Sequence, residues 1–327
     1  MKAWQLSRYG EPQEVLELAE VPQPSPGSGQ LLVRVLAAAA NFPDALMCLG
    51  TYQVRPPLPF SPGVELCGEV VAAGPDVTGF AAGDRVIGGT VLPHGAFAEY
   101  ALMDAAGALP APPGLDDAEA APFYITYQTG WFGLHRRARL APGETLLVHA
   151  AAGGVGSGAV QLGKAAGARV IGVAGGPEKT AVARELGADV VVDRHQEDFV
   201  AVVKDVTGGR GADVVYDPVG GDAFRKSTKC IAFEGRILVV GFASGDIPTA
   251  ALNHALVKNY SIVGLHWNMY AKKEPQSLRD AHTQLTALVA DGLIRPLVGE
   301  RLRLGDVAHG LARLADGDVI GRLVFVP

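Results

Sequence analysis

A glycine-rich turn lies between an apolar run and a helix-length segment near the middle of the chain. The run ETLLVHAA leads into Ala151-x-Gly153-x-x-Gly156, the dinucleotide-binding pattern with alanine in place of its first glycine. A pyrophosphate can approach the backbone where a side chain is missing, and a helix N-terminus attracts the anion. The strand-like run before the turn and the helical segment after it favour a dinucleotide site over a turn without a ligand. The predicted contacts are Ala151, Gly153, Gly154, Val155 and Gly156.

The residues after the next apolar run, RVIGVA, indicate which dinucleotide is bound. NAD sites usually carry an acidic residue about 20 positions after the glycines, where it binds the ribose 2′-hydroxyl. Here Ala174 has that position and Gly175 follows it, so no carboxylate would repel a 2′-phosphate. Lys179 and Arg194 could pair with the phosphate, although both could also be solvated surface charges. The sequence therefore predicts NADP(H), with Gly175, Lys179 and Arg194 among its contacts.

The turn belongs to a region in which short apolar runs alternate with helix-length segments. Six such runs, bounded by glycine or charged residues, lie between residues 124 and 266. This alternation is typical of a parallel sheet covered by helices on both faces, and right-handed crossovers make it a doubly wound α/β fold. The helices are expected over residues 154–166, 178–186, 196–206, 222–232 and 249–258.

The flanking regions have a different pattern. Residues 1–123 contain strand-like runs broken by proline and glycine, which indicates an all-β barrel or sandwich. Residues 267–327 contain one expected helix, over 276–291, and a strand-like end, GRLVFVP. Because this tail is too short to fold alone, we expect it to rejoin the first region. A length of 327 residues agrees with two domains.

Composition and charge exclude several classes of protein. Hydrophobic residues make up 48% and charged residues 19%, which is incompatible with a disordered chain. A net charge of −6 makes nucleic acid and anionic membranes poor partners. The three cysteines lack C-x-x-C spacing, the first residues do not form a signal peptide, and no apolar run approaches the roughly 18 residues of a membrane span. We expect a soluble cytoplasmic protein.

Five segments together are more specific than the glycine pattern alone. They are NFPDALMCLGTYQ (residues 41–53), PGVELCGEV (62–70), GDRV (83–86), AAGGVG (151–156) and GRLV (321–324). With them, essentially the whole chain resembles the zinc-independent quinone oxidoreductases, the zeta-crystallin-like group of the medium-chain dehydrogenase/reductase superfamily. The resemblance implies a GroES-like β-barrel catalytic domain from residues 1–123 and 267–327, with a Rossmann domain, residues 124–266, inserted in it. It also implies an active site in the cleft between the domains.

The resemblance bears on metal binding as well. Zinc-dependent relatives have cysteine where this chain has Asn41, and Gly-His-Glu where it has Gly63, Val64 and Glu65. Asparagine and valine cannot replace a thiolate and an imidazole as zinc ligands. We therefore expect a metal-free protein. Without a Lewis acid, the acceptors that fit best are quinones and carbon–carbon double bonds conjugated to a carbonyl.

The resemblance assigns catalytic roles to three residues of the 41–53 segment. Asn41 would lie near the nicotinamide, Asp44 would be an orienting carboxylate, and Tyr52 matches the proton-donating tyrosine of the related 2-enoyl thioester reductases. A phenol with a pKa of about 10 remains protonated at neutral pH and can deliver a proton. The alternative is that Asn41 and Asp44 cap a turn and that Tyr52 is a buried aromatic residue.

Further contacts follow from the resemblance. Thr129 would hydrogen-bond near the nicotinamide or act as an ordinary helix cap. Gly241 and Phe242 end the fifth strand of the predicted sheet, where such sheets bind their ligands. Arg322 would reach the cofactor phosphates or lie on the acidic surface. An aromatic wall for a flat quinone could consist of Tyr52, Tyr127, Trp131, Trp267 and Tyr270.

The predicted function is NADPH-dependent hydride transfer to a quinone, enone or enal, without a metal. The alternatives are a 2-enoyl thioester reductase and an NADPH-binding protein without turnover. By the resemblance, the protein partner is a second copy of the chain, paired through the apolar edge YSIVGLH, because an uncovered apolar edge would promote aggregation. The sequence leaves a tetramer open.

Overall fold

In the computed structural model, which describes residues 1–327, the chain forms two compact units. Unit 1 comprises Met1–Ile125, Pro275–His282 and Arg295–Pro327, and unit 2 comprises Thr126–Glu274 and Thr283–Ile294. The predicted division differs at residues 124–125, which pack with unit 1, and at residues 267–274 and 283–294, which pack with unit 2. The reason is aromatic and polar packing inside unit 2, where Tyr270 stacks on Phe132 and Trp131 Nε1 donates to Gln284 Oε1.

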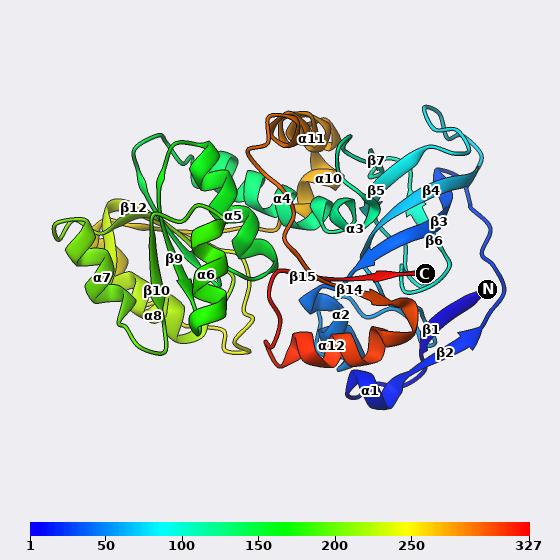
Figure 1. Ribbon diagram of the computed structural model, residues 1–327, viewed down its shortest axis with the longest axis horizontal. Coiled ribbons are helices and arrows are strands. Elements are labelled where there is room, and N and C mark those ends of the chain that lie inside the picture. Colours follow the sequence, from blue (N-terminus) through cyan, green and yellow to red (C-terminus); the bar gives the residue numbers. More distant parts are fainter. The chain divides into compact units, whose positions relative to one another are not determined.

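Unit 1 is built on a seven-stranded sheet with strands from both ends of the chain (Figure 1). The strands of unit 1 are β1 (Lys2–Leu6), β2 (Leu16–Glu20), β3 (Gln30–Ala39), β4 (Glu65–Ala73), β5 (Arg85–Gly89), β6 (Tyr100–Asp104), β7 (Leu109–Pro110), β14 (Val298–Arg303) and β15 (Arg322–Val326). The sheet order is β14-β15-β3-β4-β5-β7, β6 also pairs with β3, and β1 and β2 form a separate pair. Because β15 pairs antiparallel with β3, the C-terminal tail rejoins the first region, as predicted.

Short helices and aromatic packing complete unit 1. Its helices are α1 (Pro12–Val15), α2 (Phe42–Cys48), α3 (Asp117–Ala120), α12 (Val307–Ala315) and a 3₁₀ turn at Leu304–Asp306. In the core, the rings of Phe97 and Phe325 meet edge to face, with centroids 5.3 Å apart. This arrangement is favourable for aromatic pairs and anchors β15 to the rest of the sheet.

Unit 2 contains a six-stranded parallel sheet. Its strands are β8 (Thr145–His149), β9 (Arg169–Ala174), β10 (Val190–Asp193), β11 (Ala212–Asp217), β12 (Ile231–Val239) and β13 (Ser261–Gly264). The order β10-β9-β8-β11-β12-β13 is that of the doubly wound dinucleotide-binding fold. β8 is buried along its whole length, as expected for a strand covered on both faces. The predicted fold class is confirmed.

Helices connect the strands of unit 2, and Figure 1 shows α5 and α6 on the same face of its sheet. The helices are α4 (Phe123–Trp131) with a π-helical turn at Phe132–Arg137, α5 (Gly154–Ala165), α6 (Pro177–Glu185), α7 (Phe199–Val206), α8 (Gly221–Cys230), α9 (Leu252–Lys258), α10 (Asn268–Lys273) and α11 (Pro275–Ala290). α4 and α11 contribute residues to both units. α7 starts later than predicted because the Asp198 carboxylate caps it by accepting Val200 N–H at 3.3 Å. α8 ends earlier because Ile231 is already extended and begins β12.

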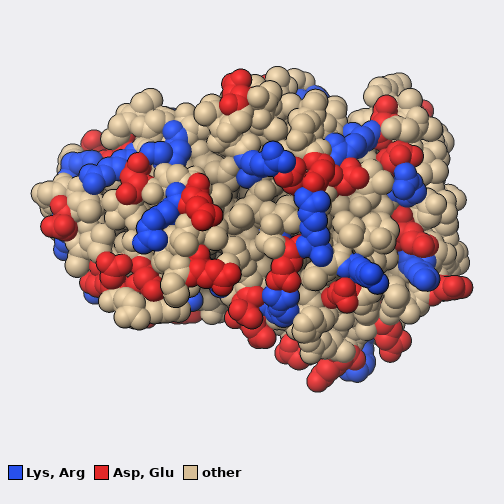
Figure 2. Space-filling model, viewed as in Figure 1, with Lys and Arg blue, Asp and Glu red and all other residues tan.

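The surface carries mixed charge. Figure 2 shows acidic and basic side chains interspersed over the visible face, which agrees with the small net charge of −6. None of the helices combines the length and the hydropathy needed to cross a lipid bilayer.

Candidate functional site

Tight backbone contacts shape the turn between β8 and α5. Ala150 has a left-handed backbone, with φ of 51°, and its carbonyl oxygen accepts Gly153 N–H at 2.8 Å. A Cβ on Gly156 would lie 2.0 Å from that oxygen, so only glycine fits there. A Cβ on Gly153 would lie 3.2 Å from it. Alanine fits at position 151 because Gly172, the neighbour of its methyl group, has no side chain.

The N-terminus of α5 lies at this turn, at the carboxyl end of β8. Gly153 is the N-cap residue and provides no capping side chain, and Gly154 and Val155 form the first turn. The first N–H groups of a helix have no partner within it and carry partial positive charge. Because the turn also lacks side chains at its closest approaches, it fits an anion of the pyrophosphate type.

Residues predicted to contact the 2′-phosphate meet at the end of β9, where the Asp193 carboxylate also accepts Gly176 N–H at 3.0 Å. A Cβ on Gly175 would lie 2.8 Å from Arg194 Nε and 3.0 Å from the His195 ring, so both side chains occupy the space next to this glycine. Lys179 lies in the first turn of α6 and is half-buried. The structure thus brings Gly175 and Arg194 together. Sequence reasoning missed His195, although it directly follows Arg194 at the end of β10.

Asp217, the last residue of β11, organises the segment that follows β12. Its carbonyl oxygen accepts Gly241 N–H at 3.3 Å, and its Oδ1 accepts Gly220 N–H at 2.9 Å. Phe242 is exposed, and its ring lies 2.9 Å from the place that a Cβ on Gly220 would take. Gly241 and Phe242 therefore lie at the carboxyl end of the sheet, like the dinucleotide turn. Thr129, elsewhere in unit 2, is buried in α4.

Three strand ends of unit 1 bring distant residues together. β3 ends two residues before Asn41, β4 begins at Glu65, and β15 begins at Arg322. Because β3 pairs antiparallel with both β4 and β15, its end lies beside the beginnings of the other two. The three residues are 4%, 0% and 6% exposed, respectively, and form a buried polar cluster.

Both amide hydrogens of Asn41 are used inside this cluster. Nδ2 donates to Ala39 O at 3.1 Å and to Glu65 Oε1 at 2.9 Å, and Oδ1 accepts from Arg322 Nη2 at 2.6 Å. The main-chain N–H donates to Asp44 Oδ2 at 2.8 Å. Asn41 therefore has no N–H left for a substrate, and its orientation depends on Glu65 and Arg322.

Glu65 and Arg322 form a buried ion pair. Arg322 Nη2 donates to Glu65 Oε1, and Glu65 Oε2 accepts Ile125 N–H at 2.9 Å. The alternative that Arg322 lies on the acidic surface is wrong, because the guanidinium has its counterion inside unit 1; its contact with the cofactor phosphates stays a prediction. Sequence reasoning did not count Glu65 as a site residue. The available signal was a carboxylate directly before the apolar residues Leu66 and Cys67.

Asp44 ties the start of α2 to the segment before β4. Its Oδ2 accepts from Asn41 N, and its Oδ1 accepts the N–H groups of Gly63 and Val64, both at 3.1 Å. Complete burial raises the pKa of Asp44 to about 7, although these N–H groups favour the charged form. The capping contacts are thus present, and an orienting role in catalysis stays a prediction. Nowhere in the chain do three or more His, Cys, Asp or Glu side chains converge as a metal site requires.

Tyr52 follows α2 and is half-buried against the hydrophobic core of unit 1. Burial and, secondarily, the Asp44 carboxylate raise the pKa of Tyr52 above its ordinary value of 10.0. The phenol therefore stays protonated at neutral pH. Asp44 and Tyr52 both belong to unit 1, and the Asp44 carboxylate acts electrostatically on the phenol of Tyr52.

The residues of the predicted aromatic wall serve different purposes. Tyr127 is fully buried, and Trp131 and Tyr270 both pack on Phe132, with ring centroids 5.0 Å and 4.4 Å from its ring. Tyr52 belongs to unit 1. Packing therefore accounts for Tyr127, Trp131 and Tyr270, and the fourth ring of unit 2, that of Trp267, is half-buried. A wall that contacts substrate stays a prediction.

Comparison with known proteins agrees with this geometry. Residues 27–113 match the family described as alcohol dehydrogenase GroES-like domain, and residues 154–283 match zinc-binding dehydrogenase. The quinone oxidoreductase-like protein 2 homolog of Nematostella vectensis is 39% identical over 301 residues, 91% of this chain and 82% of that protein.

Solved structures resemble the chain along its whole length. The quinone oxidoreductase of Pseudomonas syringae has a TM-score of 0.92 and 34% identity, covering 100% of this chain and 99% of that one. The quinone oxidoreductase of Escherichia coli, solved in complex with NADPH, has a TM-score of 0.93 and 30% identity, covering 100% of both chains. Together with the doubly wound sheet and the GroES-like unit, these similarities show that the chain belongs to the quinone oxidoreductases of the medium-chain dehydrogenase/reductase superfamily.

Proposed function

We propose that this oxidoreductase reduces a quinone or an activated carbon–carbon double bond with NADPH, without a metal ion. The observation that carries the choice of cofactor is the end of β9, where the bare Gly175 faces Arg194 Nε and the His195 ring. A 2′-phosphate at this position would meet two nitrogen-bearing side chains, and charge-assisted hydrogen bonds of this kind are strong. The relative from Escherichia coli that was solved with NADPH supports this choice.

Unit 2 supplies the residues that hold the cofactor. The α5 N-terminus and the side-chain-free turn before it receive the pyrophosphate, and the segment fixed by Asp217 receives the nicotinamide side. When bound, NADPH supplies the hydride. The contacts proposed in unit 2 are Thr129, Ala151, Gly153, Gly154, Val155, Gly156, Gly175, Lys179, Arg194, Gly241 and Phe242. Arg322, predicted as a further contact, belongs to unit 1, where it pairs with Glu65.

Unit 1 supplies the proton. A quinone or an enone that has accepted a hydride carries negative charge, which a phenol can neutralise by donating its proton. Tyr52 is protonated at neutral pH and half-exposed, whereas the N–H groups of Asn41 are committed and the Asp44 carboxylate accepts backbone hydrogen bonds. We assign Tyr52 as the general acid, with Asn41 and Asp44 positioning the segment that carries it.

The residue types argue against zinc. Asn41 and Val64 offer an amide and an isopropyl group, and neither is a ligand of catalytic zinc sites. An acceptor whose negative charge spreads along a conjugated system depends less on a Lewis acid than a simple ketone does. This favours a quinone, enone or enal as the substrate.

Initial rates of NADPH and NADH oxidation test the proposal, measured with 1,4-benzoquinone, a 2-enal and crotonyl-CoA, with zinc content recorded in parallel. We expect NADPH-selective turnover of the quinone or the enal in zinc-free protein. Preference for crotonyl-CoA would indicate the 2-enoyl thioester reductase instead. Tight NADPH binding without turnover of any acceptor would refute the catalytic role, and turnover that requires zinc would refute the metal-free mechanism.

We also propose a homodimer in the cytoplasm, formed through the edge strand β13. Ile262 on this strand is exposed, and Ile247, Leu252 and Leu256, which precede the strand in the chain, are 71%, 75% and 76% exposed. An apolar face beside an unpaired strand edge is a site for association with a second copy. Light scattering should give twice the chain mass, and Ile262→Lys should give monomers; a monomeric wild type would refute this assembly.

A further inference from the structure

A basic pocket lies in unit 2, at the end of the sheet opposite the dinucleotide turn. Helices α7, α8 and α9 all end there, and each carries a lysine in its last turn. The pocket has a volume of about 410 Å³. It is lined by Lys204, Gly209, Arg210, Gly211, Lys229, Cys230, Ile231, Phe233, Val257 and Lys258, with no acidic residue among them.

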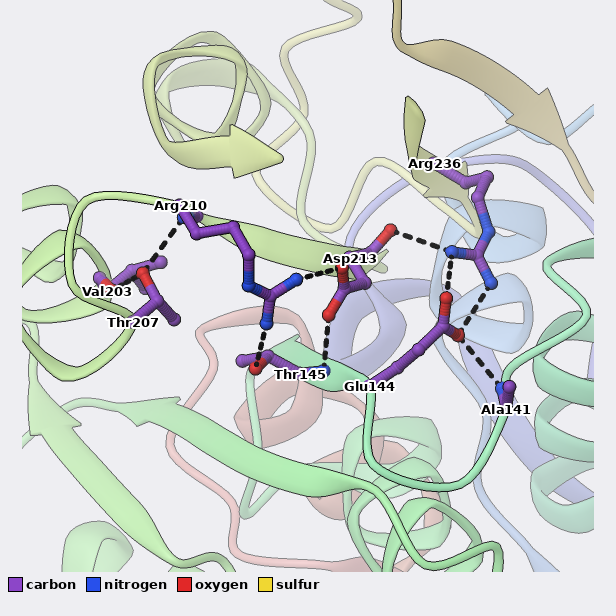
Figure 3. A network of polar contacts seen from close by, with 9 residues as sticks. Ala141, Glu144, Thr145, Val203, Thr207, Arg210, Asp213 and Arg236 are labelled. Atoms are coloured by element: carbon purple, nitrogen blue, oxygen red, sulfur yellow. Dashed lines mark hydrogen bonds and ion pairs between the residues drawn. The ribbon is translucent and has the colours of Figure 1, made fainter. Parts of the chain in front are cut away.

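The positive charge of this pocket is only partly compensated. Arg210 pairs with Asp213 and reaches Thr145 Oγ1 at 3.3 Å, so its charge is balanced (Figure 3). Lys204, Lys229 and Lys258 form no ion pair, and Lys258 Nζ donates to the carbonyl oxygen of Thr228 at 2.8 Å. A helix C-terminus offsets about half a charge, so the three helix ends leave roughly half of the lysine charge uncompensated.

The lysines are close enough to act together. Lys204 and Lys258 both line the pocket, and burial and then the charge of Lys204 lower the pKa of Lys258. Like charges held together in a pocket are stabilised when an anion binds between them.

The pocket also has an apolar side. Pairing between β11 and β12 skips residues 232–235 of β12, where Glu234 has a left-handed backbone with φ of 60°. This bulge carries Phe233, which is 68% exposed, and Val257 at the end of α9 is 78% exposed. An exposed phenylalanine next to unpaired lysines favours a ligand with an apolar group and a charged group.

The opposite wall is held in place by hydrogen bonds. Thr207 Oγ1 donates to the Val203 carbonyl at 2.6 Å and accepts Gly211 N–H at 2.9 Å (Figure 3). Gly209 and Gly211 both have left-handed backbones that suit glycine. The loop that leads into β11 is therefore fixed, and the pocket does not need to form on binding.

We propose that this pocket binds an amphipathic organic anion, namely a phosphate, sulfate or carboxylate attached to an aromatic or short apolar group. The charged group would lie between Lys204 and Lys258, and the apolar group would contact Phe233, Val257 and the side chain of Ile231. The volume suits a small ligand of this kind. The site is independent of the proposed reaction, because the amino ends of parallel strands lie opposite the ends that bind the dinucleotide.

Isothermal titration of the full chain in its native assembly tests this site, with 1-naphthyl phosphate and inorganic phosphate as probes, each with and without NADPH. We expect one saturable site per chain for 1-naphthyl phosphate, with a Kd that NADPH does not change, and weaker binding of inorganic phosphate. No saturable binding, or displacement of 1-naphthyl phosphate by NADPH, would overturn the proposal.

Variants locate the site. In Lys204→Gln/Lys258→Gln, loss of two charge-assisted contacts should raise the Kd at least about tenfold. Phe233→Ser should remove most of the preference for 1-naphthyl phosphate over inorganic phosphate. The matched control is Lys272→Gln/Lys273→Gln, which removes two lysines from the last turn of α10, outside the pocket. An equal loss in the control would show that net charge, and not this pocket, binds the anion.

Discussion

The substitution Glu65→Gln tests whether charge holds the buried cluster of Asn41, Glu65 and Arg322. Glutamine has nearly the same shape as glutamate, so packing is preserved. It offers one acceptor oxygen, whereas Glu65 accepts on Oε1 from Asn41 and Arg322 and on Oε2 from Ile125 N. Whichever way the amide points, at least one donor then faces an NH₂ group.

The larger cost comes from Arg322. Arg322 is 6% exposed and loses the carboxylate with which it forms an ion pair. Removing one partner of a buried pair costs about 3–5 kcal/mol, because the other charge remains buried and uncompensated. For units of 150–250 residues, about 2–4 °C of melting temperature corresponds to 1 kcal/mol, so unit 1 should melt roughly 6–20 °C lower.

Calorimetry can resolve this transition, with Glu69→Gln as the matched control. Glu69 lies on the same strand and pairs with Arg34 at 2.9 Å, but the two side chains are 39% and 46% exposed. Exposed pairs contribute about 0–1 kcal/mol, so the control should melt close to the wild type. Glu65→Gln/Arg322→Met removes both charges and should recover much of the loss. Equal melting of the Glu65 and Glu69 variants, or a double variant worse than Glu65→Gln, would refute the reasoning.

Three further substitutions test the proposed site. Tyr52→Phe should lower kcat about 10²–10⁴-fold with unchanged NADPH affinity, and unchanged kcat would exclude Tyr52 as the acid. In the wild type, loss of kcat through deprotonation of Tyr52 should begin only above pH 10, because the pKa of this phenol is raised above 10.0. Arg194→Ala should raise KM for NADPH about tenfold or more and leave KM for NADH unchanged, whereas an equal rise for both would exclude a 2′-phosphate contact. Gly156→Ala should abolish NADPH binding measured by fluorescence, since its Cβ would lie 2.0 Å from Ala150 O; retained affinity would show that the turn can relax.

The fold could be predicted where the signal is local. Six apolar runs separated by helical segments require a sheet buried on both faces, and the structure has that sheet. The domain boundaries depend on contacts between distant segments. Nothing in the local pattern around Tyr270 shows that its ring stacks on Phe132, although this contact places residues 267–274 with unit 2.

The same distinction applies to the candidate site. The turn at Ala151–Gly156 is contiguous, and its spacing alone indicates an anion at a helix N-terminus. Glu65 and Arg322 are 257 positions apart and meet only because β4 and β15 both pair with β3. A buried ion pair of this kind has no sequence signature, since each residue by itself resembles an ordinary charge at a strand end.

Asn41 shows why the position of a residue does not determine its role. The resemblance placed it near the reacting groups, and an asparagine amide could serve there as a donor. In the structure, Ala39 O and Glu65 take both hydrogens, and Arg322 binds the oxygen. This is why we propose Tyr52 as the proton donor, since its phenol is neutral and half-exposed. If Asn41 positions this segment, Asn41→Asp should lower the melting temperature of unit 1, because the new carboxylate would repel that of Glu65. Tyr52→Phe should lower kcat alone.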